Sequence, residues 1–436
     1  MRRTRLAVQL VAALVLVGGA QADAPGEDSG PIIVSDPTPP PPPPKAKKPD
    51  TTFKVYWKDG LRMDTADKSF RLKVGGRIMN DFAFFDESSG IENGIIGKTD
   101  DGAEFRRARL YVAGEIYDRV IFKAQYDFED GDASFKDVYM GLKKLPFLGT
   151  FKVGHFKEPF SLEELTSSKY ITFMERSLPN AFAPGRNTGF GFFNSLLDER
   201  MTLASGIFLE ADDFGESDGD NWFWSARTTG LPLFNGPDCL LHLGASLRVG
   251  DPNDNEASFD SRPEAHLAND YADTGYDPLL AGGPIPANDT AVTWGAEAAG
   301  VWGPFSMQGE YIGTHLDTAG GTGDPNFRGW YLFGSWFITG EHRTYKPSDG
   351  TFSRVKPASN FLQDKGTGAL ELALRFSQLD LADSGINGGE LDDWTVGMNW
   401  YLNPNVRTMF NYVHGNPRQL SAGDADIFQM RFQIDF

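Results

Sequence analysis

The sequence has no uninterrupted apolar run of the roughly 18–20 residues that a transmembrane helix requires, and it holds a single cysteine, Cys239. The first absence excludes a helical membrane protein. The second excludes an intrachain disulfide and a cysteine-based metal site. A metalloprotease HExxH motif and a glycine-rich phosphate-binding loop are also missing, so nothing indicates an enzyme, a metal or a cofactor. The net charge of −19 disfavours nucleic acid as a partner.

Aromatic residues and glycine are abundant by contrast, with 34 Phe, 13 Tyr, 9 Trp and 49 Gly. From Phe70 onward apolar and polar residues alternate, which is the pattern of a strand with one face in an apolar medium and the other in water. We therefore expect an all-β protein. Sixteen segments fit the pattern: 70–86, 103–117, 120–129, 134–143, 150–157, 188–197, 200–210, 221–230, 238–249, 290–301, 304–313, 328–338, 367–377, 391–402, 404–413 and 426–436.

The connections between these segments alternate in length. Those after even-numbered segments are mostly tight, for example DR, DE, WGP and NPN, and those after odd-numbered segments include the long stretches 87–102, 158–187 and 250–290. Short periplasmic turns and long external loops are typical of an outer-membrane barrel. We predict a 16-stranded antiparallel transmembrane β-barrel. The long connection 339–366 breaks the rule, which leaves either an elaborated turn or a miscounted hairpin.

The N-terminus carries an export signal. MRRTR is basic, LAVQLVAALVLVGG is apolar, and Ala20-Gln21-Ala22 is a small-x-small cleavage site, so residues 1–22 are predicted to be a signal peptide. Residues 23–52 contain six consecutive prolines, 39–44, and are predicted to be an extended periplasmic linker. A tether that binds peptidoglycan or a partner is the alternative. The barrel domain then covers 53–436.

The C-terminal segment, DIFQMRFQIDF, alternates apolar and polar residues up to the last position. A final amphipathic strand that ends in phenylalanine is similar to the signal read by the barrel-assembly machinery. We assign Phe436 to that role.

If the apolar face contacts lipid, the opposite face lines the lumen, and its basic residues outnumber its acids. Arginine suits an anion path because it makes bidentate contacts with oxyanions, although any one of these arginines could pair with a nearby carboxylate instead. Arg106 falls on the lipid face near the outer rim, where contact with lipopolysaccharide phosphates is a further hypothesis. The predicted path residues are Arg71, Lys73, Arg77, Arg107, Arg109, Lys123, Arg227, Arg248, Arg375, Arg407 and Arg431. The acids on the same face are Glu115, Asp127, Asp137, Glu297, Glu310, Glu371 and Asp435.

A barrel of this size encloses a bore too wide to select small ions. The best candidate to narrow it is the long segment after the fifth strand, folded inward as a constriction loop. Lys169, Arg176 and Arg186 are available there to face the constriction. The acids of the same segment, Glu163, Glu164 and Glu175, could cancel them.

Several stretches resemble the phosphate-selective porins O and P, and the resemblance runs from about Phe53 to Phe436. They include GGRIMNDFAFFD, GAEFRRARLYVAGEIYD, FKDVYMGLK, HFKEPFSLEELTSSKYITFMERS and NAFAPGRNTGF. The resemblance implies a 16-stranded, usually trimeric barrel with an inward third loop, an arginine ladder, and a constriction that binds phosphate or polyphosphate. Carried to matching strands, the ladder falls on Arg77, Arg107, Arg109, Arg227 and Arg375. The chain departs from the pattern in its acidity and in a constriction loop of balanced charge.

We therefore predict passive diffusion of small anions, with phosphate or polyphosphate preferred, across the outer membrane of a Gram-negative-type envelope. The expected partners are inorganic anions, the lipid bilayer and lipopolysaccharide, the barrel-assembly machinery, and further copies of the chain in a homotrimer. Two alternatives stay open. One is a general-diffusion porin with weak selectivity. The other is a non-conducting barrel that tethers the envelope through its proline-rich arm.

Overall fold

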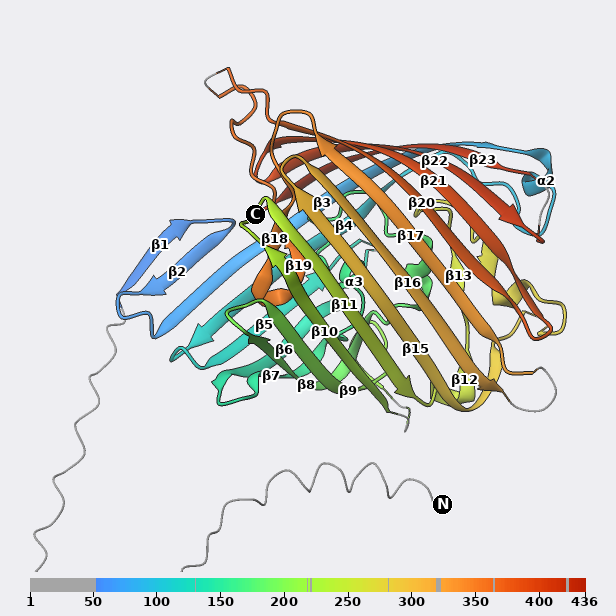
Figure 1. The fold of residues 1–436 in the computed structure, drawn as a ribbon, viewed down its shortest axis with the longest axis horizontal. Coiled ribbons are helices and arrows are strands. Elements are labelled where there is room, and N and C mark those ends of the chain that lie inside the picture. The colour runs from blue at the N-terminus through green and yellow to red at the C-terminus, as the bar shows by residue number, and fades with distance from the viewer. Residues whose placement is uncertain are drawn as a thin grey trace, which may run out of the picture. The chain divides into compact units, whose positions relative to one another are not determined.

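The computed structural model describes residues 52–436, apart from 130, 218, 220, 221, 281, 319–322, 364, 421 and 422. The predicted signal peptide, 1–22, and nearly all of the predicted linker, 23–52, lie outside the described residues. Within the described part, 16 antiparallel strands form a closed barrel (Figure 1). The barrel closes where the last strand pairs with the first, for example Asp435 with Arg77 and Gln429 with Ala83.

The barrel strands confirm the predicted sixteen. They are β3 (Phe70–Glu87), β4 (Gly102–Ile116), β5 (Val120–Asp127), β6 (Ser134–Leu145), β7 (Gly149–Lys157), β8 (Arg186–Leu196), β9 (Met201–Leu209), β10 (Phe223–Phe234), β11 (Cys239–Gly250), β15 (Ile285–Trp302), β16 (Phe305–Thr318), β17 (Asn326–Phe337), β20 (Ala369–Asp383), β21 (Ile386–Asn403), β22 (Val406–Arg418) and β23 (Ala425–Asp435). Several strands run further than predicted toward the long loops. Polar residues at these ends of β20 and β21 suggested a loop in the sequence. In the structure Asp380 and Glu390 pair with each other and continue the two strands.

Shorter elements lie in the connections and at the N-terminal end. They are β1 (Phe53–Trp57), β2 (Leu61–Thr65), β12 (Glu256–Ala257), β13 (Asp260–Ser261), β14 (Ala272–Asp273), β18 (Thr344–Lys346), β19 (Thr351–Ser353), α2 (Ser89–Glu92), α3 (Leu162–Leu165), η1 (Leu178–Phe182), η2 (Asn253–Asn255), η3 (Thr274–Tyr276) and η4 (Pro347–Asp349). The hairpin β1–β2 was not predicted. Its second strand, β2, pairs with the start of β3, and the hairpin projects beyond the barrel wall (Figure 1).

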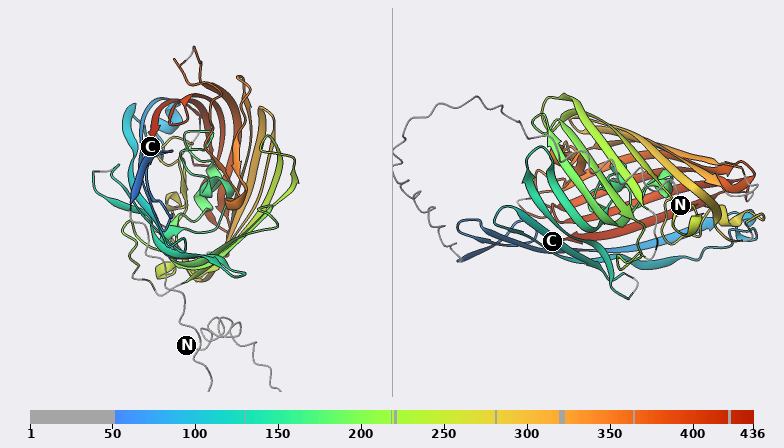
Figure 2. Two further views of the ribbon diagram at one scale, coloured as in Figure 1. Left: turned by 90° about the vertical axis from the view of Figure 1, so that its left-hand side faces the viewer. Right: turned by 90° about the horizontal axis from the view of Figure 1, so that it is seen from below.

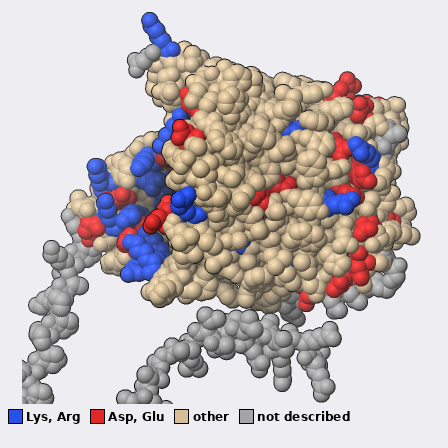
Figure 3. All heavy atoms as spheres, in the orientation of Figure 1, with Lys and Arg blue, Asp and Glu red and all other residues tan. Residues whose placement is uncertain are grey.

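The outer wall is apolar because side chains alternate across each strand. On β21, Trp394 is 50% exposed on the outside while its neighbour Thr395 is fully buried on the inside. Figure 3 shows a broad belt with few charged residues across the visible wall. Charged residues gather at both ends, with Lys and Arg predominant at the end that carries β1 and β2 and acids predominant at the opposite end. No helix among the described residues is long and apolar enough to cross a membrane.

The lumen is filled along one side. The segment 158–185, with α3 and η1, lies inside the barrel (Figure 2, left). It packs with the segment 251–284 against the inner faces of β10 to β23. The principal apolar cluster there includes Phe160, Leu178, Tyr271, Phe327 and Leu379, each at most 2% exposed. The core of this protein therefore sits between its loops and half of its wall.

The long connection after β17 is an elaborated turn, so the strand count was right. Its hairpin, β18–β19, folds into the lumen from the short-turn end. Tyr345 packs with Leu162 and Phe352 in a second apolar cluster, and the Tyr345 hydroxyl lies 2.6 Å from Nδ1 of His242 on β11. The backbone NH of Phe352 donates to the Thr166 hydroxyl at 3.4 Å, so this hairpin meets the segment that contains α3.

Candidate anion path along the inner wall

The predicted path residues lie on inward positions of the strands, and all but Arg71 and Lys73 fall into two groups. One group surrounds an open cavity beside β3 to β8, and the other is enclosed by the packed loops. The cavity is about 180 Å³ in volume, and we call it the central cavity. Its lining residues are Arg77, Arg107, Arg109, Lys123, Asp137, Lys157, Leu165, Ser167, Ser168, Arg176 and Arg186. Seven basic side chains and a single carboxylate thus face this space.

Some of these cations are paired. Asp137 accepts from Lys123 at 2.5 Å and from Arg186 at 2.7 Å. Arg109 forms an ion pair with Asp127, which lies opposite it on β5. These ion pairs hold Arg109, Lys123 and Arg186 in place, and the two carboxylates offset much of their positive charge.

Arg77 and Arg107 keep donors free for a ligand. Arg77 donates to the hydroxyls of Ser168 at 2.6 Å and Ser167 at 3.4 Å, and no carboxylate of the described chain pairs with it. Arg107 reaches Glu175 only at 3.8 Å, and its Nη1 donates to Sδ of Met79 at 3.6 Å, a weak acceptor. Two guanidinium groups and two hydroxyls thus converge on the cavity, a donor set that suits an oxyanion.

A larger space of about 720 Å³ opens toward the short-turn end, and we call it the vestibule. It shares Asp137, Lys157 and Leu165 with the central cavity, so the two are adjacent. Its other basic residues are Lys143, Lys144, Lys152 and Arg227. Lys152 packs its ammonium over aromatic rings, 4.3 Å from the Phe193 centroid and 5.1 Å from that of Tyr139. The ring faces attract the ammonium, which has no carboxylate partner in the described chain.

The second group of predicted path residues clamps the loops to the wall. Arg375 is fully buried and binds Glu163 at 3.2 Å and Glu264 at 2.5 Å. Those two acids come from the two long segments that fill the lumen, so Arg375 joins both to β20. Arg431 on β23 binds Asp81 of the neighbouring strand β3 at 2.5 Å and Glu175 of the inward segment at 2.6 Å.

Arg227, Arg248 and Arg407 act similarly. Arg227 binds Glu297 at 2.6 Å and donates to the carbonyl of Gly350 at 2.8 Å, beside the β18–β19 hairpin. Arg248 binds Glu158 at 3.2 Å, and Arg407 donates to the carbonyl of Ile171 at 2.8 Å. Each links the wall to an inward segment, and none of the three lines the central cavity, although Arg227 also borders the vestibule.

Arg71 and Lys73 lie near the short-turn end of β3. Arg71 pairs with Glu115 at 3.0 Å and Asp118 at 3.4 Å. Lys73 lies over the ring of Tyr111, 5.2 Å from its centroid. Neither lines the central cavity.

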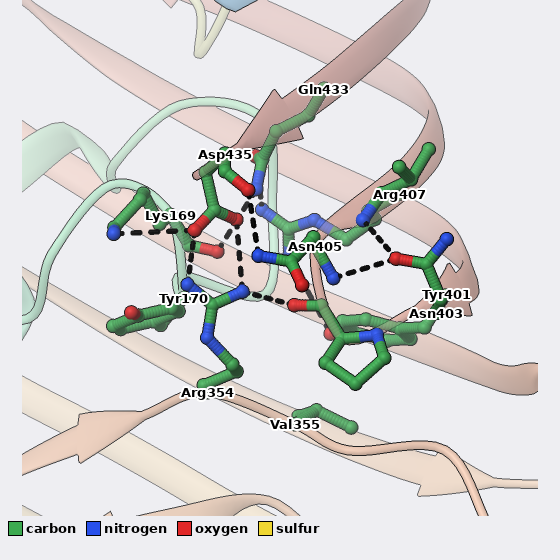
Figure 4. A pocket seen from close by; sticks show the side chains of 12 residues that line it. Lys169, Tyr170, Arg354, Val355, Tyr401, Asn403, Asn405, Arg407, Gln433 and Asp435 are labelled. Atoms are coloured by element: carbon green, nitrogen blue, oxygen red, sulfur yellow. Dashed lines mark hydrogen bonds and ion pairs between the residues drawn. The ribbon is translucent and has the colours of Figure 1, made fainter. Parts of the chain in front are cut away.

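The predicted constriction residues also separate. Arg176 and Arg186 line the central cavity, although Arg186 is the first residue of β8 rather than part of the loop. Lys169 lies apart, in the pocket of Figure 4. It contacts Asp435 at 3.3 Å, and Arg354 from the segment after β19 pairs with the same carboxylate. This group ties the inward segments to the last strand.

The hypothesis that Arg106 faces outward toward lipopolysaccharide is wrong. The β3–β4 register shifts between Met79 and Asp81, which forms a bulge on β4, and a bulge displaces the alternation of side chains. Phe105 is consequently the exposed residue, at 58%. Arg106 turns inward and donates to Glu175 at 3.0 and 3.1 Å.

The sequence reasoning did not single out several polar residues of the two cavities, among them Lys143, Lys144, Lys152, Lys157, Ser167 and Ser168. Lys152 and Lys157 both lie on β7, but they have opposite parity, so strict alternation places only one of them on the inward face. The serines carry no such signal, because their place depends on how segment 158–185 folds.

A closed barrel of this size with a charged internal passage defines the porins, which are channels rather than enzymes. The chain belongs to the family of phosphate-selective porins O and P, whose model matches residues 72–436. It is 30% identical to Porin O of Pseudomonas aeruginosa over 414 residues, which cover 87% of this chain and 91% of that protein. It is 29% identical to an uncharacterized protein of Caulobacter vibrioides over 90% of this chain and 79% of that one.

Solved porin structures share the fold. An anion-selective porin from Comamonas acidovorans aligns with a TM-score of 0.52 at 13% identity, over 84% of this chain and all of that one. The outer-membrane protein OmpT of Vibrio cholerae aligns with a TM-score of 0.53 at 11% identity, over 88% of this chain and all of that one. Family membership and fold together make this protein an outer-membrane porin.

Proposed function

We propose that this porin conducts small anions and binds phosphate-like oxyanions in the central cavity. The observation that carries the proposal is the cavity lining itself, in which seven basic side chains face the space beside one carboxylate. A fixed positive field in a narrow passage raises the local concentration of anions. The family's description and the name of the Comamonas porin agree with this selectivity.

The proposed route runs through the vestibule and the central cavity along β3 to β9. Segment 158–185 acts as the constriction because it supplies Leu165, Ser167, Ser168 and Arg176 to the cavity. Arg77 and Arg107 are the proposed primary ligands. Arg109, Lys123 and Arg186 contribute field rather than free donors, since each is paired with a carboxylate.

The rest of the predicted organisation belongs to the same proposal. Residues 1–22 direct export, 23–52 are a periplasmic linker, and 53–436 form the channel, which assembles as a homotrimer. The barrel-assembly machinery reads the C-terminus, where the Phe436 backbone pairs with that of Gly76 on β3. Lipopolysaccharide remains a predicted partner of the outer surface, without Arg106. Phosphate and polyphosphate are both candidate substrates.

A general-diffusion porin is the competing function, and one observation favours it. Most of the predicted path arginines are paired with carboxylates or backbone carbonyls, for example Arg375 with Glu163 and Glu264. A lumen neutralised in this way would pass small solutes with little discrimination.

The zero-current potential of the purified porin in a planar bilayer, under a potassium chloride gradient, separates the two functions. We expect an anion-selective potential and a chloride current that phosphate blocks. A potential near zero without block would support general diffusion. The absence of any conductance would support the envelope tether.

A further inference from the structure

Glu164 lies directly behind the central cavity, on the single turn of α3. Its side chain is nearly buried and is not part of the cavity lining. The Ser161 hydroxyl caps the turn by accepting from the Glu164 backbone NH at 3.1 Å. The carboxylate is thereby held at a fixed place just outside the space where an anion would bind.

Two cations of the cavity are bound to this one carboxylate. The Lys157 ammonium lies 2.7 Å from Glu164 Oε1, and Arg176 Nε lies 3.1 Å from Oε2. Burial opposes ionisation, but Arg176 and Lys157 outweigh it and lower the pKa of Glu164 to about 2. The carboxylate is therefore charged at every physiological pH.

Arg176 has little capacity left for an anion. Its guanidinium also donates to the backbone carbonyls of Glu163, Glu164 and Thr166 at 3.1 to 3.2 Å. Lys157 also donates to the backbone carbonyl of Glu164. Its ammonium has three donors on a flexible stem, however, so a donor released from the carboxylate can turn toward the cavity.

The neighbouring Glu163 provides a matched contrast. It lies on the same turn and is equally buried. Its oxygens bind Arg375 at 3.2 Å and the Ser177 hydroxyl at 2.6 Å, and neither partner lines the central cavity. Removing its charge disturbs the same segment without freeing a cavity cation.

We propose that Glu164 is a positioning residue that sets the anion affinity of the central cavity by holding back Lys157 and offsetting its charge. The inference rests on the proposed function of the cavity. Its consequence is a passage that binds oxyanions weakly enough to release them, whereas a cavity without this carboxylate would retain them.

The test compares Glu164→Gln, Glu163→Gln and Lys157→Gln with the unmodified porin, together with the double variant Glu164→Gln/Lys157→Gln. The measurement is the inorganic phosphate concentration that halves the chloride current in a planar bilayer. A unit charge released near the site in a partly screened environment shifts binding by an order of magnitude, so Glu164→Gln should lower that concentration about tenfold. Glu163→Gln should leave it unchanged, and in the Lys157→Gln background the effect of Glu164→Gln should largely disappear.

Block that is unchanged or weakened in Glu164→Gln overturns the inference, as does an equal effect of Glu163→Gln. The zero-current potential of each variant gives a second readout. If phosphate blocks the unmodified porin and Glu164→Gln behaves identically, the inference fails while the proposed function stands. If the unmodified porin shows neither block nor anion selectivity, the proposed function fails. In that case, a zero-current potential of Glu164→Gln that is more anion-selective than that of the unmodified porin would still support Glu164 as the residue that offsets the cavity charge. An unchanged potential would overturn this role as well.

Discussion

The two halves of the inner wall carry the same residue types and use them differently. Along β3 to β9, basic side chains face open space, and neither Arg77 nor Arg107 has a close carboxylate partner in the described chain. Along β10 to β23, arginines such as Arg375 are sealed under the inward segments by their own carboxylates. An arginine on a lumen-facing position is therefore a ligand or a clamp according to what the loops bring to it.

Removing a buried ion pair on the β10–β23 wall should produce the largest effect, a loss of stability of the folded barrel. Arg375→Met leaves Glu163 and Glu264 buried without their common partner, and loss of one member of a buried ion pair costs about 3–5 kcal/mol. We expect a clear drop in the temperature at which the folded barrel loses its compact mobility in gel electrophoresis. Arg328→Gln is the control, because its pair with Asp380 is exposed and such pairs contribute little. Equal melting of both variants would contradict the clamp.

Removing a basic side chain from the central cavity should change phosphate binding rather than the stability of the barrel. Arg107→Gln removes a guanidinium that lines the central cavity and lies 3.8 Å from its nearest carboxylate partner, Glu175. Hydrogen bonds to charged groups contribute about 1.5–3 kcal/mol, so phosphate block should weaken about tenfold or more. The melting temperature should change little. A variant that still blocks at the original phosphate concentration would exclude Arg107 from the site.

Replacing Lys152 in the vestibule should have a smaller effect, on chloride conductance. Its ammonium lies among aromatic rings and adds to the field that concentrates anions. Lys152→Gln should lower the chloride conductance at low salt, and the difference should vanish at high salt because screening removes it. Lys346→Gln is the matched control, since Lys346 is exposed and paired with Asp349 at 2.6 Å. A salt-independent loss in Lys152→Gln would indicate altered structure instead.

The smallest expected effect is a pH dependence from Lys169. Burial, partly opposed by Asp435, lowers the pKa of Lys169 to about 8. Its charge is present below that pH and is lost above it, so the anion selectivity should decline slightly between pH 7 and pH 9. Lys169→Gln should lack this component of the decline. An identical pH profile in the variant would remove Lys169 from the account.

Alternation along single strands predicted the barrel because lipid on one side and water on the other impose a period of two. The same reasoning failed at Arg106, where a bulge inserts a residue into β4 and turns the side chain inward. It also could not separate Arg77 from Arg375. Both occupy inward positions, but the partners of Arg375 come from segments about 110 and 210 residues away in sequence, and loop packing of that kind has no periodic signal.

The central claim is that anions pass along the β3–β9 wall. Anomalous diffraction from crystals of the porin soaked in bromide or arsenate would locate bound anions directly. We expect density in the central cavity, within hydrogen-bonding distance of Arg77, Arg107 and Ser168, with none at Arg375 or Arg431. Density confined to the arginines of the β10–β23 wall would contradict the account.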